Sequence, residues 1–201
     1  MTRRLIVFAR APLPGEAKTR LASAVGEREA AGVYARLLYR YLLALAQAHW
    51  RDVTLQLSVA SRADVPYFAE AFPEFSVRVQ CAGDLGKRLA GAFEEAFVAG
   101  ARSVVVTASD IPDIDAPLIR RAFWTLEEAQ GVIGPCPDGG YYLLGLRAPG
   151  APLFDGVSWG SDRVLAQTEV LARAAGLTLV HLPERMDVDT AADWTQWRRR
   201  V

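Results

Sequence analysis

Cysteine and histidine are scarce in this sequence, which holds two of each among 201 residues. Cys81 and Cys136 lie far apart and in no metal-ligand or redox spacing, which predicts a reduced protein of the cytoplasm. His49 and His181 belong to no Ser/His/Asp or Cys/His pattern. The sequence therefore disfavours the chemistry of a nucleophilic hydrolase.

An excess of charge of either sign is also missing, since 23 basic residues balance 23 acidic ones. A net charge of zero gives no overall attraction to nucleic acid or to an anionic membrane, so any phosphate site must be a local cluster. No apolar run approaches the roughly 20 residues of a transmembrane helix. The composition, 51% hydrophobic and 23% charged, is that of a globular protein. At about 150 residues per domain, residues 1–201 are expected to form one domain.

Strand-like and helix-like segments alternate along the chain. Continuous apolar runs such as Leu5–Ala9 are typical of strands covered on both faces, and apolar residues at helical spacing mark the segments between them. The predicted strands are 5–9, 53–60, 75–81, 103–107, 131–134, 141–146 and 177–182, and the predicted helices are 27–48, 63–72, 85–100, 115–129, 164–175 and one opened by 190–193. This alternation predicts an α/β sandwich with a mostly parallel sheet, whose ligands bind at the carboxyl ends of the strands.

The segment after the first strand is basic, because Arg10, Lys18 and Arg20 fall within eleven residues. Pro14 and Gly15 exclude a helix at its start. A loop of this kind suits a polyphosphate, through backbone N–H groups and cationic side chains. It matches neither the P-loop pattern nor the GxGxxG dinucleotide pattern. The alternative interpretation is a solvated basic loop without a ligand.

Acidic residues follow two later strands. Asp110, Asp113 and Asp115 come after strand 103–107, and Asp187 and Asp189 come after strand 177–182. Carboxylate oxygens are preferred ligands of Mg²⁺ and Mn²⁺, and they leave positions open for phosphate. The alternative is that these residues cap helices or close turns, as predicted for Asp115. The basic loop and the acidic clusters are expected to meet on one edge of the sheet and hold a nucleotide–metal complex.

Two other loops have shapes that suit a ligand. Gly83, Asp84 and Arg88 lie at a predicted helix start, and Asp138-Gly139-Gly140 joins two strands, where it could simply form a hairpin turn. Trp159 lines a pocket or is a buried aromatic beside a helix cap. Trp194 and Trp197 pack on a second subunit, forming a homodimer, or on the same core.

Six motifs occur in order along nearly the whole chain: FARAPLPGEAKTRL, GDLGKRL, SDIPD, PDGGYYLLGL, the Trp159-Gly160-Ser161 segment and DVDT. Together they resemble a bacterial GT-A-fold, glycosyltransferase-like family of the nucleotide-diphospho-sugar transferase superfamily. The likeness extends in style to 2-phospho-lactate and molybdenum-cofactor guanylyltransferases. One departure is the run Ala108-Ser109-Asp110-Ile111-Pro112, where a Gly-Ser-Asp-Cys-Pro type is expected.

The resemblance implies a Rossmann-like, three-layer sandwich with one reversed strand and a site dependent on Mg²⁺ or Mn²⁺. It implies that Lys18 and Arg20 hold phosphates and act with Asp110 in catalysis, and that Asp110 and Asp189, with Asp187, hold the metal. Asp138, Gly139, Gly140 and Trp159 would face the sugar or acceptor. The nucleotide site would comprise Ala9, Arg10, Pro14, Gly15, Lys18, Arg20, Gly83, Asp84 and Arg88.

The favoured interpretation is a transferase that takes a nucleotide sugar and a small-molecule acceptor, for which the short chain leaves limited room. A nucleotidyltransferase that joins a nucleoside triphosphate to a phosphorylated acceptor and releases pyrophosphate is the alternative. A non-catalytic nucleotide-binding protein on the same fold is the third possibility.

Overall fold

The computed structural model describes residues 2–198 and contains the predicted alternation of strands and helices. The strands are β1 (Thr2–Ala9), β2 (Val53–Val59), β3 (Ser76–Val79), β4 (Ala101–Thr107), β5 (Gly131–Pro135), β6 (Tyr141–Leu146) and β7 (Leu179–His181). The α-helices are α1 (Thr19–Val25), α2 (Glu27–Ala46), α3 (Val65–Ala71), α4 (Leu85–Val98), α5 (Ala116–Glu128), α6 (Val164–Ala174) and α7 (Ala191–Arg198). Short 3-10 helices, η1 (Arg62–Asp64) and η2 (Ala151–Phe154), precede α3 and follow β6. Within the described residues, α1 and η2 are the elements that the periodicity did not predict.

The described strands form one seven-stranded sheet in the order β3-β2-β1-β4-β6-β5-β7. β6 runs antiparallel to both of its neighbours, β4 and β5, and the other pairings are parallel. The predicted α/β class and the single reversed strand are therefore confirmed. The chain builds β1, β2 and β3 outward in one direction and then returns to place β4 on the other side of β1. A crevice for ligands is expected at this reversal, between the carboxyl ends of β1 and β4.

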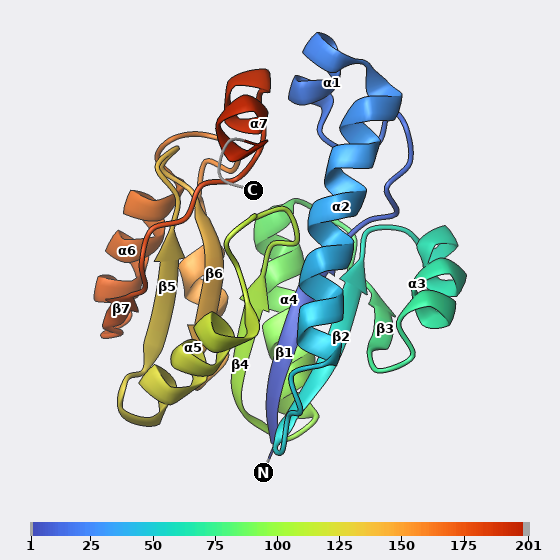
Figure 1. Cartoon of the computed structure of the whole chain (residues 1–201). Helices are drawn as coiled ribbons and strands as arrows, with labels where there is room; N and C mark the ends of the chain where they lie inside the picture. The colour runs from blue at the N-terminus through green and yellow to red at the C-terminus, as the bar shows by residue number, and fades with distance from the viewer. Residues whose placement is uncertain (1, 199–201) are drawn as a thin grey trace.

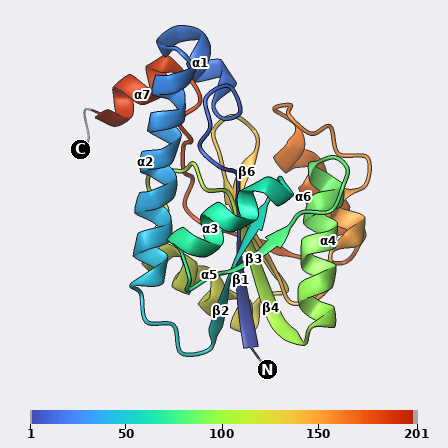
Figure 2. The same ribbon diagram turned by 90° about the vertical axis from the view of Figure 1, so that its right-hand side faces the viewer.

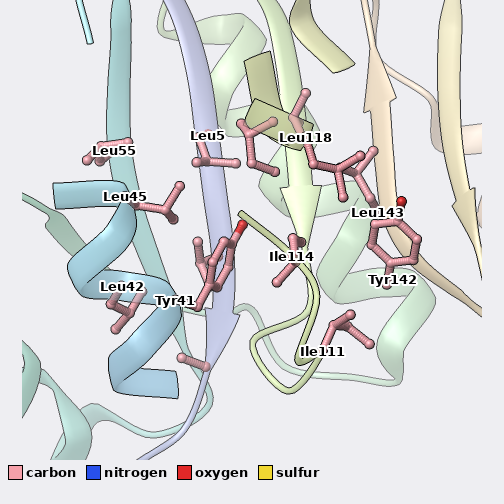
Figure 3. Close-up of a cluster of buried hydrophobic side chains, with 14 of the residues drawn as sticks. Leu5, Tyr41, Leu42, Leu45, Leu55, Ile111, Ile114, Leu118, Tyr142 and Leu143 are labelled. Atoms are coloured by element: carbon pink, nitrogen blue, oxygen red, sulfur yellow. The ribbon is translucent and has the colours of Figure 1, made fainter. Parts of the chain in front are cut away.

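Helices cover both faces of the sheet, which gives three layers (Figures 1 and 2). On one face α2, α3 and α5 pack over side chains such as Leu5, Val7 and Leu143. Figure 3 shows Tyr41, Leu42 and Leu45 of α2 pointing toward this face. On the other face α4, η2 and α6 pack over Ile6 and its neighbours. Because neighbouring residues of β1 enter different cores, the strand reads as an unbroken apolar run.

A third apolar cluster lies beyond the carboxyl ends of the strands, where α1 and α7 are found (Figure 1). Val188 and Trp194 pack there against Leu21 of α1 and against α2. Trp194 is thus buried on the core of its own chain, as one of the two interpretations expected. The cluster joins the segment that carries Asp187 and Asp189 to the helix that follows Lys18. No helix of the described residues is long and apolar enough to cross a membrane.

Candidate functional site

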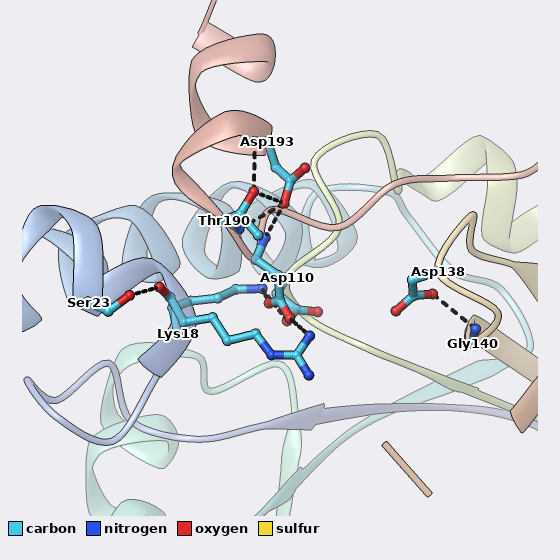
Figure 4. A network of polar contacts seen from close by, with 9 residues as sticks. Lys18, Ser23, Asp110, Asp138, Gly140, Thr190 and Asp193 are labelled. Atoms are coloured by element: carbon cyan, nitrogen blue, oxygen red, sulfur yellow. Dashed lines mark hydrogen bonds and ion pairs between the residues drawn. The ribbon is translucent and has the colours of Figure 1, made fainter. Parts of the chain in front are cut away.

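Lys18 stands between two of the predicted acidic residues. Its Nζ lies 2.7 Å from Oδ2 of Asp110 and 2.7 Å from Oδ1 of Asp189, which are 92 and 171 residues away along the chain. Figure 4 shows the Lys18 side chain extended toward Asp110. The basic loop and the acidic clusters therefore meet on one edge of the sheet, as predicted from their positions after the strands.

The Lys18 side chain is only 4% exposed. Burial alone lowers the pKa of a lysine, but the Asp110 and Asp189 carboxylates outweigh this effect and raise the pKa of Lys18 above its usual value. The ammonium therefore keeps its charge in the cleft. The Lys18 backbone is left-handed, with φ of 54° and ψ of 48°, an unusual conformation for a residue with a side chain. Lys18 is the N-cap residue of α1, and its side chain contacts Asp110 and Asp189.

Asp187 completes a group of three carboxylates. Asp110, Asp187 and Asp189 each offer one oxygen, and these oxygens lie within 4.8 Å of one another. Burial and the charge of Asp189 raise the pKa of Asp187 to about 6, whereas Lys18 opposes that shift. Three carboxylates face one ammonium, so the group has an excess of negative charge. A hard divalent cation such as Mg²⁺ or Mn²⁺ matches this set of oxygen donors.

The helix cap near Asp189 is made by other residues. The Thr190 hydroxyl accepts a hydrogen bond from the Asp193 backbone N–H at 3.2 Å, and Asp193 Oδ2 accepts from the Thr190 backbone N–H at 2.8 Å. This capping box opens α7, as the sequence predicted (Figure 4). It leaves the Asp189 carboxylate to face Lys18. The alternative that Asp189 is only a helix-start residue is therefore not what the geometry shows.

Asp115 does cap a helix, as expected, because its Oδ1 accepts from the Leu118 backbone N–H at 2.9 Å. Asp84 has the same role for α4, accepting from Lys87 at 2.9 Å. Both carboxylates thus cap helices, a structural role that does not depend on a ligand.

A cleft of about 510 Å³ lies over the carboxyl ends of β3, β2, β1 and β4. Among the predicted nucleotide and metal residues, those that line it are Ala9, Arg10, Lys18, Arg20, Arg88, Asp110 and Asp189. Pro14, Gly15, Gly83 and Asp84 do not line the cleft, and neither does Asp187. Arg20 is 73% exposed, and its Nη1 lies 3.8 Å from Asp189. This guanidinium therefore remains largely available to a ligand.

Two residues that the sequence did not indicate, Asp64 and Tyr34, hold the loop after β1. Asp64, which is buried, accepts a hydrogen bond from the Ala11 backbone N–H at 3.1 Å. The Tyr34 hydroxyl accepts from the Arg10 backbone N–H at 3.2 Å and lies 2.9 Å from the Ser109 hydroxyl. Tyr34 is a buried residue of α2. Its hydroxyl connects the loop after β1 to the residue before Asp110.

Asp138, which was predicted to face an acceptor, is not a hydrogen-bond partner of Lys18, but its charge contributes to the raised pKa of Asp187. Asp138 Oδ1 accepts from the Gly140 backbone N–H at 3.0 Å, so this segment is the hairpin turn between β5 and β6 (Figure 4). Gly139 has φ of 84°, and a Cβ there would lie 2.0 Å from the Asp162 carbonyl oxygen. The two alternatives for this segment, a turn and a ligand contact, are compatible, but the structure supplies a packing reason for Gly139.

Trp159 closes over the start of α4. Its ring packs near Phe154 and Tyr141, and its loop is held by Gln167, whose Oε1 accepts from the Ser158 backbone N–H at 2.7 Å. A Cβ on Gly86 would lie 2.6 Å from Trp159 Nε1 and 3.0 Å from the Phe154 carbonyl oxygen. The close approach of α4 and the Trp159 loop therefore requires glycine at position 86.

Replacing Gly86 with alanine should destabilise the protein by about 1–3 kcal/mol, because the new methyl group has no room beside Trp159. Gly32→Ala in α2 is the matched control, since a Cβ there meets nothing within 4 Å. The control should be neutral or stabilising by up to about 1 kcal/mol, since alanine favours the helix. Urea unfolding curves compare the two variants, and equal stability would contradict the close packing at Gly86.

Residues 42–161 match the family described as "Uncharacterized protein conserved in bacteria (DUF2064)". A crystal structure from Desulfovibrio desulfuricans G20, described as a candidate nucleotide-diphospho-sugar transferase, is 34% identical with a TM-score of 0.91. The alignment covers 100% of this chain and 88% of that chain. None of the curated proteins compared with the chain matches it.

More distant structures share the fold. A Mycobacterium tuberculosis H37Rv protein in complex with manganese is 18% identical, with a TM-score of 0.57 and all of both chains covered. The inositol-1-phosphate CTP transferase from T. maritima is 15% identical, with a TM-score of 0.59 over 96% of this chain and 91% of that chain. At these identities the likeness concerns the arrangement of the strands and helices, which is that of the nucleotide-diphospho-sugar transferase fold.

Proposed function

We propose a nucleotide-dependent transferase activity for this chain, which belongs to the DUF2064 family of bacterial proteins. The observation that carries the proposal is the meeting of Lys18, Asp110 and Asp189 at the strand-order reversal, inside a cleft lined by Arg20. The description of the Desulfovibrio desulfuricans relative supports it. A phosphate-binding cation beside a carboxylate group suits the phosphates of an activated donor.

Each residue of the site has a chemical task in this proposal. Asp110, Asp189 and Asp187 would hold Mg²⁺ or Mn²⁺, which supplies Lewis-acid neutralisation of phosphate charge when it is bound. Lys18 and Arg20 would bind the donor phosphates and stabilise the charge that collects on them as the leaving group departs. Because the Asp110 and Asp189 carboxylates raise the pKa of Lys18, its ammonium stays cationic across the neutral range.

The favoured donor is a nucleotide sugar, from which a sugar passes to a small acceptor and a nucleoside diphosphate leaves. The second candidate is nucleotidyl transfer, in which a phosphorylated acceptor attacks the α-phosphate of a nucleoside triphosphate and pyrophosphate leaves. The pairing of Lys18 with the largely exposed Arg20 favours this second candidate, because two cations suit a triphosphate.

A thermal-shift panel of nucleoside triphosphates and nucleoside diphosphate sugars, each with and without Mn²⁺, tests the proposal. A ligand at 100 times its Kd should stabilise the protein by about 2.7 kcal/mol, or roughly 5–10 °C in Tm. A metal-dependent shift with a nucleotide sugar supports glycosyl transfer, and a shift with triphosphates alone supports nucleotidyl transfer. If no nucleotide in the panel shifts the Tm in a metal-dependent way, the proposed function is wrong.

A further inference from the structure

The cleft has a second end, away from Lys18, whose lining residues have a different character. This end is lined by Ala60 after β2, by Gln80 after β3, and by Leu85 and Arg88 at the start of α4. β3 lies three strands from β4 in the sheet, which separates Gln80 from Asp110 by about 14 Å at the usual strand spacing. That span suits a nucleotide whose phosphates are held at Lys18 and whose base reaches the α4 end.

Hydrogen bonds fix the Gln80 side-chain amide. Its Nε2 donates to the Ser58 carbonyl oxygen at 2.8 Å, and its Oε1 accepts from Arg88 Nη1 at 3.4 Å. The Ser58 contact determines which end of the amide faces Arg88. The Gln80 oxygen is consequently occupied by Arg88, which leaves it a poor acceptor for a ligand.

The Arg88 side chain is held by two hydrogen bonds and keeps further N–H donors unused. Its Nε donates to the Gly83 carbonyl oxygen at 2.9 Å, in the loop that the Asp84 cap joins to α4. A guanidinium carries five N–H donors and no acceptor. With one donor on Gly83 and one on Gln80, three remain on the two Nη atoms. Leu85, which is 44% exposed, adds an apolar surface for a flat ring beside them.

We infer that Arg88 selects the base of the nucleotide and accepts guanine or cytosine over adenine and uracil. A guanidinium fork binds two neighbouring acceptor atoms best. Guanine offers O6 and N7, and cytosine offers O2 and N3. In adenine an amino donor stands beside N1 and N7, and in uracil the N3–H separates the two carbonyl groups. This inference rests on the proposed function, because it assumes that the Lys18 end holds phosphates.

The competing role for Arg88 is contact with phosphate, which would be indifferent to the base. Substituting Arg88 with lysine separates the two roles, since lysine keeps the positive charge and loses the planar fork. Lys87→Gln is a suitable control, because Lys87 is an exposed neighbour on α4 that does not line the cleft.

The experiment measures the Kd of GTP, CTP, ATP and UTP with Mn²⁺ by calorimetry, for the unmodified protein, Arg88→Lys and Lys87→Gln. We expect GTP or CTP to bind about 10- to 100-fold more tightly than ATP and UTP, as for a bidentate arginine–base pair. Arg88→Lys should reduce that preference to within about threefold and leave the ATP and UTP affinities nearly unchanged, while Lys87→Gln keeps the preference. If GTP binds most tightly, 7-deaza-GTP, which lacks N7, should lose most of the gain in affinity over ATP and UTP. If CTP binds most tightly, cytosine and not guanine is the selected base.

Two other outcomes would overturn the inference while the proposed function stands. One is equal affinity for the four triphosphates, or a preference for ATP or UTP, in the unmodified protein. The other is an equal loss of affinity for all four triphosphates in Arg88→Lys, which would show that Arg88 contacts the phosphates. If none of the four nucleotides binds in a metal-dependent way, the proposed function fails and this inference fails with it.

Discussion

Asp110→Asn should abolish metal-dependent nucleotide binding and weaken Mn²⁺ binding by about 100-fold or more. Asp110 shares the Lys18 ammonium with Asp189, and its oxygen lies in the three-carboxylate group. The asparagine amide has no negative charge. Removing one of three anionic ligands weakens the binding of a hard divalent cation, and the effect is large in a site that is partly shielded from water. Asparagine is nearly the same size as aspartate, so the packing around position 110 should be preserved.

Asp115→Asn is the control for that substitution. It makes the same chemical change five residues along the chain, at a carboxylate that caps α5 and lies outside the three-carboxylate group. Asparagine is as good as aspartate at a helix N-cap, so stability should be retained. Mn²⁺ titration followed by electron paramagnetic resonance gives the metal affinity, and calorimetry gives the nucleotide affinity. If Asp110→Asn binds both ligands as the control does, the metal assignment is wrong.

Most of the fold could be predicted because the pattern that specifies it is local. Buried strands such as β1 read as unbroken apolar runs, since Leu5 and Ile6 enter different cores. α1 was missed for a physical reason: it has seven residues, begins at a left-handed Lys18 and has no side-chain cap. Its stability comes from Leu21 in the cluster with Val188 and Trp194, which lie more than 160 residues away in the sequence. Sequence periodicity cannot report packing of that kind.

The site was predictable as a place and less so as an arrangement. Because parallel strands share a carboxyl edge, the positions of Lys18, Asp110 and Asp189 after their strands sufficed to bring them together. The sequence did not reveal that Asp64 and Tyr34 hold the loop after β1 through its backbone N–H groups. Nor did it show that Gln80 orients Arg88. These partners depend on side-chain direction, which only the folded structure determines.

The arrangement at Lys18 has a consequence for the order in which ligands bind. Its Nζ is hydrogen-bonded to two of the three carboxylates that would hold a metal. A metal cation that binds those oxygens competes with the Lys18 ammonium for them. Leaving the buried ammonium without its partners costs free energy. Bound phosphates would give Lys18 new anionic partners. Metal and nucleotide are therefore expected to assist each other, and the assistance is reciprocal for binding free energies.

Lys18→Met should consequently raise the affinity of the nucleotide-free protein for Mn²⁺ while it lowers the affinity for nucleotide. A charge-assisted hydrogen bond contributes about 1.5–3 kcal/mol, so losing one such competitor converts to about 10- to 100-fold tighter metal binding. Methionine retains the unbranched, apolar part of the side chain. Without metal the variant should be less stable, because three carboxylates then face one another without the ammonium, and Mn²⁺ should restore its Tm.

Arg20→Met is the comparison that isolates the role of Lys18. Arg20 lies 3.8 Å from Asp189 and is largely exposed, so solvent screens its charge. This variant should change Mn²⁺ affinity by less than about twofold, yet it should weaken nucleotide binding, because Arg20 is proposed to contact phosphate. Mn²⁺ titrations without nucleotide, followed by nucleotide titrations at saturating Mn²⁺, measure both effects. Unchanged or weaker Mn²⁺ binding in Lys18→Met would show that the ammonium does not compete for the carboxylates, and the expected coupling of metal and nucleotide would lose its physical basis.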